Sequence, residues 1–203
     1  MDLKSTYNLI AEDWDRDHLY DDWWIAGTNT FMAFLRPGVH ILDAGCAGGI
    51  KSEAFIRNGF AVTGIDLSEK MIEIARKRVS GGDFRVIDLY DLSGIKEVFD
   101  AVFLQAVLLH FSKKDAPTII RSLAAKIKPG GYFYIAVKEI RPGGKEEEIV
   151  HEEDYGYDYA RFFSYFTADE IEKYLADTNF EVVYVSVLPA GKTNWIQVIG
   201  RKL

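Results

Sequence analysis

The sequence predicts an α/β protein with a doubly wound, mainly parallel sheet of seven strands that closes with a C-terminal antiparallel hairpin. Three observations support this class. Short apolar runs alternate with helical patterns between residues 39 and 137, two further strand-like runs end the chain, and small residues follow the first strand. Strands that alternate with helices imply right-handed crossovers between parallel neighbours.

Each element has its own signal. Gly59 ends the first core helix, Ser68 can cap the second, and Thr167 with Glu170 forms a capping box for the last. Pro129 and the two glycines after it are expected to break the chain between a helix and a strand. The short connection 189–192 predicts a hairpin. Strands are expected at 39–43, 60–66, 84–87, 99–104, 132–137, 180–188 and 193–200, and helices at 50–58, 68–79, 117–127 and 167–178. Residues 1–35 read as helices, and residues 141–160 show no periodicity.

Composition narrows the class of protein. The 203 residues are 48% hydrophobic and 27% charged, as in a globular chain that forms one domain over residues 1–203. The formal net charge of −7 argues against direct binding to nucleic acid. Cys46 is the only cysteine and the four histidines are dispersed, so neither a disulfide framework nor a metal site is expected.

The location is expected to be cytoplasmic. The first twenty residues are acidic and lack the apolar segment of a secretory signal. The most apolar stretch, residues 101–109, is interrupted by Gln105 and is too short to cross a bilayer, so no membrane association is expected.

Polar groups collect at the ends of the predicted strands. The turn 43–49 contains small residues that let a ligand approach the backbone at a helix N-terminus. Asp66 ends the second strand, where a carboxylate can accept both hydroxyls of a ribose. Asp88 ends the third strand and can accept from an exocyclic amine, and Gln105 ends the fourth. Each has a plainer interpretation, as a cap, a turn residue or a strand-end polar group. Together they predict a small-molecule site.

Five ordered motifs resemble those of the class I S-adenosylmethionine-dependent methyltransferases, in particular the small single-domain members of the type 11 and type 12 kind. They are ILDAGCAGG at 41–49, GIDLSEKMIEIA at 64–75, FRVIDLYDL at 84–92, FDAVFLQAVLLHF at 99–111 and IKPGGYFYIAVKE at 127–139. The tail 165–183 is also similar to the family's closing helix and strand. One departure is Ala47, where the family usually has glycine. If Ala47 takes a positive φ, a small strain is expected.

The resemblance assigns cofactor-binding positions. It implies that S-adenosyl-L-methionine binds and that S-adenosyl-L-homocysteine is the product. Asp43, Gly45 and Gly49 would shape the methionine pocket, and Gln105 would face the sulfonium end. Asp66 would hold the ribose. The remaining cofactor-binding positions are Leu67 and Met71 near the adenine, Asp88 and Leu89 at its edge, and Cys46 as a small packing residue inside the turn.

The resemblance also divides the chain. Residues 1–36 would be an N-terminal helical lid, 37–140 the cofactor-binding core, 141–166 a substrate lid insertion and 167–203 the closing helix and hairpin. Residues 1–24 and 141–159 each contain seven acids against two bases, a net charge of −5 each. An acidic, aromatic lid would suit a cationic or apolar acceptor. Its expected substrate contacts are Tyr7, Trp14, Trp23, Tyr155, Tyr157 and Phe163.

The function expected from this resemblance is in-line methyl transfer to a small-molecule acceptor by a monomer or a homodimer. His110, just beyond the fourth strand, is the best-placed general base, although a loop-holding histidine is the plainer interpretation. The alternatives are an RNA or protein methyltransferase with a partner subunit, or a protein that binds the cofactor without catalysis. A nicotinamide-dependent oxidoreductase is less favoured, because the small residues of 43–49 do not follow the G-x-G-x-x-G spacing.

Overall fold

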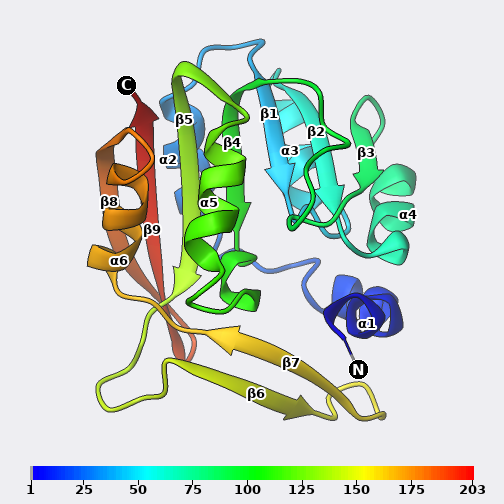
Figure 1. Ribbon diagram of the computed structural model, residues 1–203. Coiled ribbons are helices and arrows are strands. Elements are labelled where there is room, and N and C mark those ends of the chain that lie inside the picture. The colour runs from blue at the N-terminus through cyan, green and yellow to red at the C-terminus, as the bar shows by residue number, and fades with distance from the viewer. Residues whose placement is uncertain (1) are drawn as a thin grey trace. The chain divides into compact units, whose positions relative to one another are not determined.

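Seven strands hydrogen-bond in the order β3-β2-β1-β4-β5-β9-β8 (Figure 1). The structure is a computed structural model that describes residues 2–203. The pairs β1–β2, β2–β3 and β4–β5 are parallel, whereas β9 runs antiparallel to both β5 and β8. The predicted sheet, mainly parallel with a C-terminal hairpin, is therefore confirmed.

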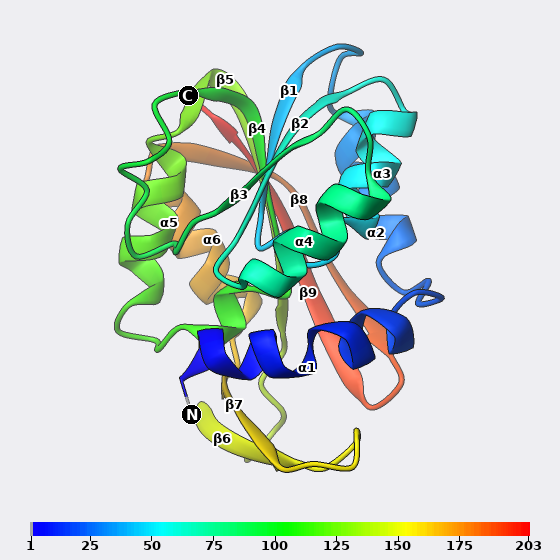
Figure 2. The ribbon, with the colours of Figure 1, turned by 90° about the vertical axis from the view of Figure 1, so that its right-hand side faces the viewer.

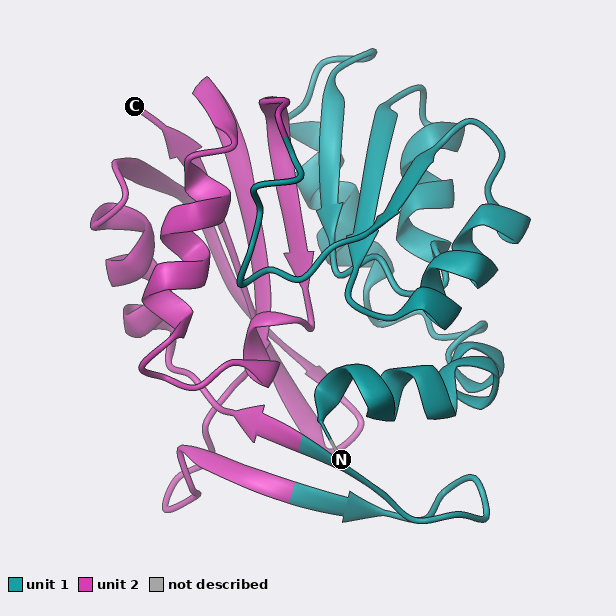
Figure 3. Cartoon of the chain, turned by 45° about the vertical axis from the view of Figure 1, so that its right-hand side comes forward, with its two compact units in different colours: residues 1–95, 150–161 teal, residues 96–149, 162–203 magenta. Residues whose placement is uncertain are grey.

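The chain divides into two compact units, which Figure 3 shows in two colours. Unit 1 comprises residues 1–95 and 150–161, and unit 2 comprises residues 96–149 and 162–203. The elements of unit 1 are α1 (Leu3–Asp17), α2 (Ile25–Ala33), β1 (His40–Ala44), α3 (Ile50–Arg57), β2 (Ala61–Asp66), α4 (Glu69–Arg78) and β3 (Asp83–Val86). Those of unit 2 are β4 (Phe99–Gln105), η1 (Leu108–His110), α5 (Ala116–Ala124), β5 (Ile127–Lys138), α6 (Ala168–Ala176), β8 (Phe180–Ala190) and β9 (Thr193–Lys202). Two strands, β6 (Glu147–Glu152) and β7 (Tyr159–Ser164), continue from one unit into the other.

Local capping explains where the helices begin. The Asp2 carboxylate accepts the Ser5 N–H at 2.9 Å and caps α1. The Ser68 hydroxyl caps α4, and Thr167 forms a reciprocal capping box with Glu170 at α6, as the sequence predicts. In unit 1 the Ser68 hydroxyl also donates to the Asn8 side chain of α1 at 2.7 Å, and Figure 2 shows α4 lying next to α1.

Two expectations from the sequence are wrong. Pro129 and its glycines lie inside β5, which begins at Ile127 through a register shift opposite β4. Pro129 is exposed, so its lack of an N–H donor leaves no buried hydrogen bond unmade. Only glycine fits at position 131, because an added Cβ would lie 2.5 Å from the Asp100 carbonyl oxygen. Residues 141–160, expected to be irregular, contribute to the two-stranded sheet of β6 and β7. The residues of β6 alternate between exposed and half-buried, but the sequence there does not alternate between polar and apolar, so the strand leaves a weak signal.

Candidate functional site

The candidate site of unit 1 begins with the glycine turn, defined as residues 44–49, which links β1 to α3. Gly45, Ala47 and Gly49 all have left-handed φ values of 76°, 47° and 83°. The N–H groups of Gly45 and Cys46 both donate to the Ile65 carbonyl at 2.7 and 2.9 Å, which fixes the turn to β2. Ala47 therefore has a positive φ, the conformation in which the sequence analysis expects a small strain.

Asp66 ends β2 beside this turn. Its carboxylate accepts the N–H of Ala47 at 3.0 Å and the N–H of Ser68 at 2.9 Å. The side chain is buried, and burial raises the pKa of Asp66 to about 6. A carboxylate has about four acceptor positions, so a cap for α4 and a ligand's hydroxyl groups can use the same side chain.

Asp43 lies in β1, before the turn. Its carboxylate accepts the Ser52 hydroxyl at 2.6 Å, which ties β1 to α3. Burial raises the pKa of Asp43 to about 6, partly offset by Ser52 and by the charge of Lys51. The Lys51 Nζ lies 5.3 Å from the centre of the Trp24 ring, and burial lowers the pKa of Lys51. Lys51 thus supplies a basic side chain in the first turn of α3, two residues after the glycine turn and outside the motif at 41–49.

A second overlooked feature is an ion pair that holds α1 against α4. The Arg78 guanidinium donates to both carboxylate oxygens of Asp15, at 2.5 and 2.7 Å, and also to the Gly48 carbonyl. The two charged side chains are only 18% and 12% exposed. Arg78 thus joins the N-terminal helix to the glycine turn. The link spans 63 residues and leaves no local signal.

The same contacts explain two small residues. An added Cβ on Gly48 would lie 2.0 Å from the Asp15 Oδ1 atom, so only glycine fits this pair. Cys46 packs with Ile72, Ala75, Val79 and Phe84 in the core of unit 1. Burial raises the pKa of the Cys46 thiol, which argues against a nucleophilic thiolate and agrees with a packing role.

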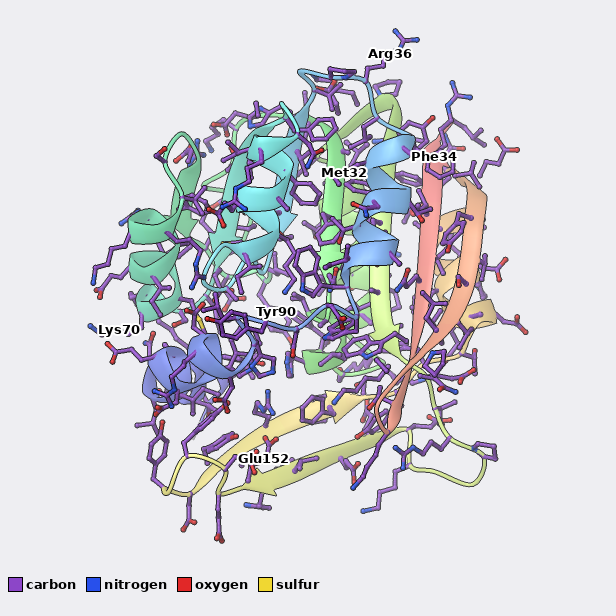
Figure 4. All side chains as sticks on the ribbon, turned by 180° about the vertical axis from the view of Figure 1, so that it is seen from behind. Met32, Phe34, Arg36, Lys70, Tyr90 and Glu152 are labelled. Atoms are coloured by element: carbon purple, nitrogen blue, oxygen red, sulfur yellow. The ribbon has the colours of Figure 1, made fainter. Side chains whose placement is uncertain are left out.

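The positions expected near the adenine lie in α4 and after β3. Met71 is fully buried in the first turn of α4, and Leu89 is buried. Asp88 is exposed, and its carboxylate accepts the Tyr90 N–H at 3.0 Å. This bond makes Asp88 a turn residue, which was the plainer interpretation of its position. Leu67 is half-buried. Tyr90, labelled in Figure 4, is 63% exposed and adds an aromatic ring beside these positions.

Within unit 1, α1 contacts the segment 150–161. The Tyr157 hydroxyl donates to Asp13 at 2.8 Å, and the Thr6 hydroxyl donates to the Ala160 carbonyl at 3.2 Å. The Tyr7 and Trp14 rings meet edge to face at 6.3 Å. Two of the predicted lid segments are therefore brought together.

The remaining aromatics of this cluster are placed less tightly. Tyr155 stacks on Tyr159 with the ring centres 5.7 Å apart, and Trp23 is half-buried. Arg161 forms a bidentate pair with Glu152, at 2.5 and 2.7 Å, and its Nη1 atom lies 3.5 Å from the Tyr7 hydroxyl. Glu152 is labelled in Figure 4. Sequence patterns gave no reason to select this buried pair.

Unit 2 holds the other predicted positions. Gln105 ends β4 and is 8% exposed. The His110 Nδ1 atom donates to the Phe162 carbonyl at 2.8 Å, and its ring centre lies 5.0 Å from that of Phe163. A carbonyl can only accept, so the proton lies on Nδ1 and the lone pair on Nε2. This bond fits both a loop-holding histidine and an oriented base.

Two further searches cover residues 2–203. In that range no group of three or more histidine, cysteine or acidic side chains is arranged to hold a metal ion. Nor does any helix in it combine the length and apolar character that crossing a membrane requires.

Comparison with known proteins identifies the central part of the chain. A family model described as a methyltransferase domain matches residues 42–135. This part of the chain is similar to a methyltransferase domain. The glycine turn, Asp66, Asp88 and Gln105 all lie within the matched residues of this methyltransferase domain.

Curated relatives resemble the methyltransferase domain over part of their length. The chain is 31% identical to a ubiquinone biosynthesis O-methyltransferase of Coxiella burnetii, over 58% of this chain and 57% of that protein. It is 35% identical to the protein of the same name from Xanthomonas campestris pv. campestris, over 56% and 49%. The chain spans about half the length of these relatives.

Solved structures share the fold. A 1,6-didemethyltoxoflavin-N1-methyltransferase of Burkholderia thailandensis, with bound 1,6-didemethyltoxoflavin and S-adenosylhomocysteine, has a TM-score of 0.78 at 21% identity, covering 98% of this chain and 87% of that one. The magnesium protoporphyrin IX methyltransferase of Synechocystis PCC 6803, with bound S-adenosylhomocysteine, has a TM-score of 0.76 at 19% identity, covering 99% and 98%. The fold is therefore that of class I methyltransferases.

Proposed function

We propose that this protein transfers the methyl group of S-adenosylmethionine to a small-molecule acceptor. The observation that supports it most is Asp66, a buried carboxylate that is fixed by two backbone donors and keeps free acceptor positions beside a turn of left-handed residues. That combination suits a ribose held next to a backbone which a ligand can approach closely. The two structural neighbours with bound S-adenosylhomocysteine agree with this choice of cofactor.

The residues present fit the cofactor group by group. Asp66 would accept the ribose hydroxyls, and Met71 and Leu89 would lie near the adenine. Asp43 and the glycine turn would shape the methionine pocket, and Lys51 supplies a cation that suits the carboxylate of an amino acid. The cofactor supplies an electrophilic methyl group on a sulfonium. The protein's part is to hold the reactants in line and exclude water.

His110 would be the general base when the acceptor must lose a proton. Its bond to the Phe162 carbonyl leaves Nε2 unprotonated in the neutral ring. We expect His110→Gln to lower kcat by about two orders of magnitude for an acceptor that loses a proton in the reaction. Binding of S-adenosylhomocysteine should not change. An equal kcat for the two proteins would exclude this role.

The acceptor is small, and the aromatic side chains of the lid favour an apolar body. Three of the fourteen acids of residues 1–24 and 141–159 are paired with arginines: Asp13 with Arg16, Asp15 with Arg78, and Glu152 with Arg161. Paired charges contribute little field beyond their partners. The aromatic side chains Tyr7, Trp14, Trp23, Tyr155, Tyr157 and Phe163 remain to contact an apolar acceptor.

The decisive experiment is calorimetric titration with S-adenosylmethionine, S-adenosylhomocysteine and NAD. We expect micromolar binding of the two adenosyl ligands and none of NAD. Asp66→Asn should weaken adenosyl binding by roughly 100-fold, because two hydrogen bonds to a charged group are weakened. Asp83→Asn, an acid on the neighbouring strand β3 with a half-exposed side chain, is the matched control and should leave it unchanged. Failure of the wild-type protein to bind either adenosyl ligand would overturn the proposal.

A further inference from the structure

Two buried glutamines lie in unit 2, and the family resemblance gives a role, at the sulfonium end of the cofactor, to Gln105 alone. Gln105 and Gln197 are the only glutamines among the 203 residues. Gln105 pairs with Ala136 across β4 and β5, and Ala136 pairs with Gln197 across β5 and β9. We call these three residues the glutamine row. Directly paired residues point to the same side of a sheet, so both carboxamides rise from one face on either side of a methyl group.

The two carboxamides have no partners within the described part of the chain. Gln197 is fully buried and Gln105 is 8% exposed. The side-chain nitrogen and oxygen of each lie without a hydrogen-bond partner among residues 2–203. Buried amides are normally satisfied, because an unmade bond leaves the full cost of removing the group from water. Two unsatisfied amides in one row call for a functional reason.

The row lies at the end of the sheet where parallel strands bind ligands, on the face opposite α6. Gly200 lies three residues from Gln197 and faces Leu175 of α6, so α6 packs on the opposite side. Gln105 is the last residue of β4, and Ala136 lies near the end of the parallel strand β5. Open parallel sheets bind their ligands at these carboxyl ends. Neighbouring strands are about 4.8 Å apart, so the two glutamine backbones stand roughly 10 Å apart with only a methyl group between them.

We propose that the glutamine row binds the methyl acceptor through a neutral polar edge that carries one donor and one acceptor, the pattern of an amide or a lactam. A carboxamide offers an N–H donor and a C=O acceptor side by side, and it matches such an edge with two hydrogen bonds. A cationic acceptor suits the row poorly. Neither amide is charged, and the ammonium of Lys138, two residues beyond Ala136 on the same face, lies 4.1 Å from the centre of the Phe163 ring.

This inference rests on the proposed function and narrows it. The acceptor would then carry an amide-like edge that satisfies the amides of the row. Specificity would be strong, because an analogue that lacks the donor or the acceptor leaves a buried amide unpaired. The row also explains why residue 136 is alanine, since a larger side chain would fill the space between the two amides.

The test uses the full chain labelled with ¹⁵N only at glutamine, which gives two side-chain amide signals because there are two glutamines. The protein is saturated with S-adenosylhomocysteine and titrated with 2-quinolinone, a lactam. Matched probes are 1-methyl-2-quinolinone, which lacks the donor, quinoline-2-carboxylate, which is anionic, and 2-naphthylmethylamine, which is cationic. We expect the lactam to shift both signals, and the methylated lactam to bind at least tenfold more weakly. Unmoved signals with every probe would overturn the proposal, and so would a preference for either charged probe.

A variant separates recognition from structure. Gln197→Met keeps the size of the side chain and removes the amide, so we expect an equal or higher Tm and a dissociation constant for 2-quinolinone raised about tenfold. Asn194→Met, an exposed amide on the same strand, is the control and should change neither. A lower Tm for Gln197→Met with unchanged lactam binding would show a purely structural row. Failure of the wild-type protein to bind S-adenosylhomocysteine would instead contradict the proposed function.

Discussion

The glycine turn of unit 1 and the glutamine row of unit 2 treat buried polar groups in opposite ways. Beside the turn, Asp43 and Asp66 each accept hydrogen bonds from the protein, and within it the Gly48 carbonyl accepts one from Arg78. In the row, the amides of Gln105 and Gln197 have no partner among residues 2–203. The difference teaches that the polar groups at the turn are satisfied by the protein itself, so they serve to keep the turn folded. The row keeps its hydrogen-bonding capacity for a ligand.

The largest expected effect comes from filling the turn. Gly48→Ala would place a methyl group 2.0 Å from Asp15 and 2.7 Å from Arg78, so the ion pair must separate or the turn must move. We expect a loss of about 3 kcal/mol in the free energy of unfolding, measured by chemical denaturation. Gly94→Ala is the control, because its methyl group would meet only Ile87 at an ordinary 3.6 Å. Equal stabilities of the two variants would contradict the account of the turn.

The next effect comes from removing the ion pair itself. Arg78→Ala leaves Asp15 and the Gly48 carbonyl without their donor, and we expect a loss of about 2 kcal/mol in the free energy of unfolding. A charge exchange, Asp15→Arg with Arg78→Asp, restores an ion pair but cannot donate to Gly48 from position 78. If the turn depends on that donor, the exchange recovers stability but not S-adenosylmethionine affinity. Recovery of both would show that only the docking of α1 matters.

The third effect depends on pH. Burial raises the pKa of both Asp43 and Asp66 to about 6, so the folded protein binds protons more tightly than the unfolded chain. Their contribution to stability is therefore present below about pH 4 and is lost as the pH rises through 6. Ribose binding needs the ionised form of Asp66. Calorimetry should show S-adenosylhomocysteine affinity rising about tenfold between pH 5 and pH 7, with a shallower rise in Asp66→Asn.

The smallest effect tests strain in the turn. Ala47 has a φ of 47°, which glycine adopts without cost, so Ala47→Gly should stabilise the protein by at most about 1 kcal/mol. Gly45→Ala, at a φ of 76°, should have the opposite sign. Thermal denaturation of the pair would show it. A destabilised Ala47→Gly would mean that the entropy of the unfolded chain outweighs the strain.

Some parts of the site could be read from the chain and others could not. The order of strands and helices, the caps of α4 and α6, and the polar strand ends at Asp66, Asp88 and Gln105 follow from patterns of fewer than about ten residues. Pro129 misled the prediction, because an exposed bulge tolerates a residue that a regular strand does not. The hairpin of β6 and β7 was overlooked because its charged residues mask the alternation of its strands.

The sequence by itself determined the fold class and the turn that defines a methyltransferase domain, since hydrophobic periodicity, caps and positive-φ glycines act between neighbours in the chain. Only the tertiary structure decided that Arg78 joins Asp15 to Gly48, that Glu152 neutralises Arg161, and that Gln197 stands beside Gln105 across Ala136. Those partners are 9 to 92 residues apart, and the register of strands and the packing of helices, not local propensity, bring them together.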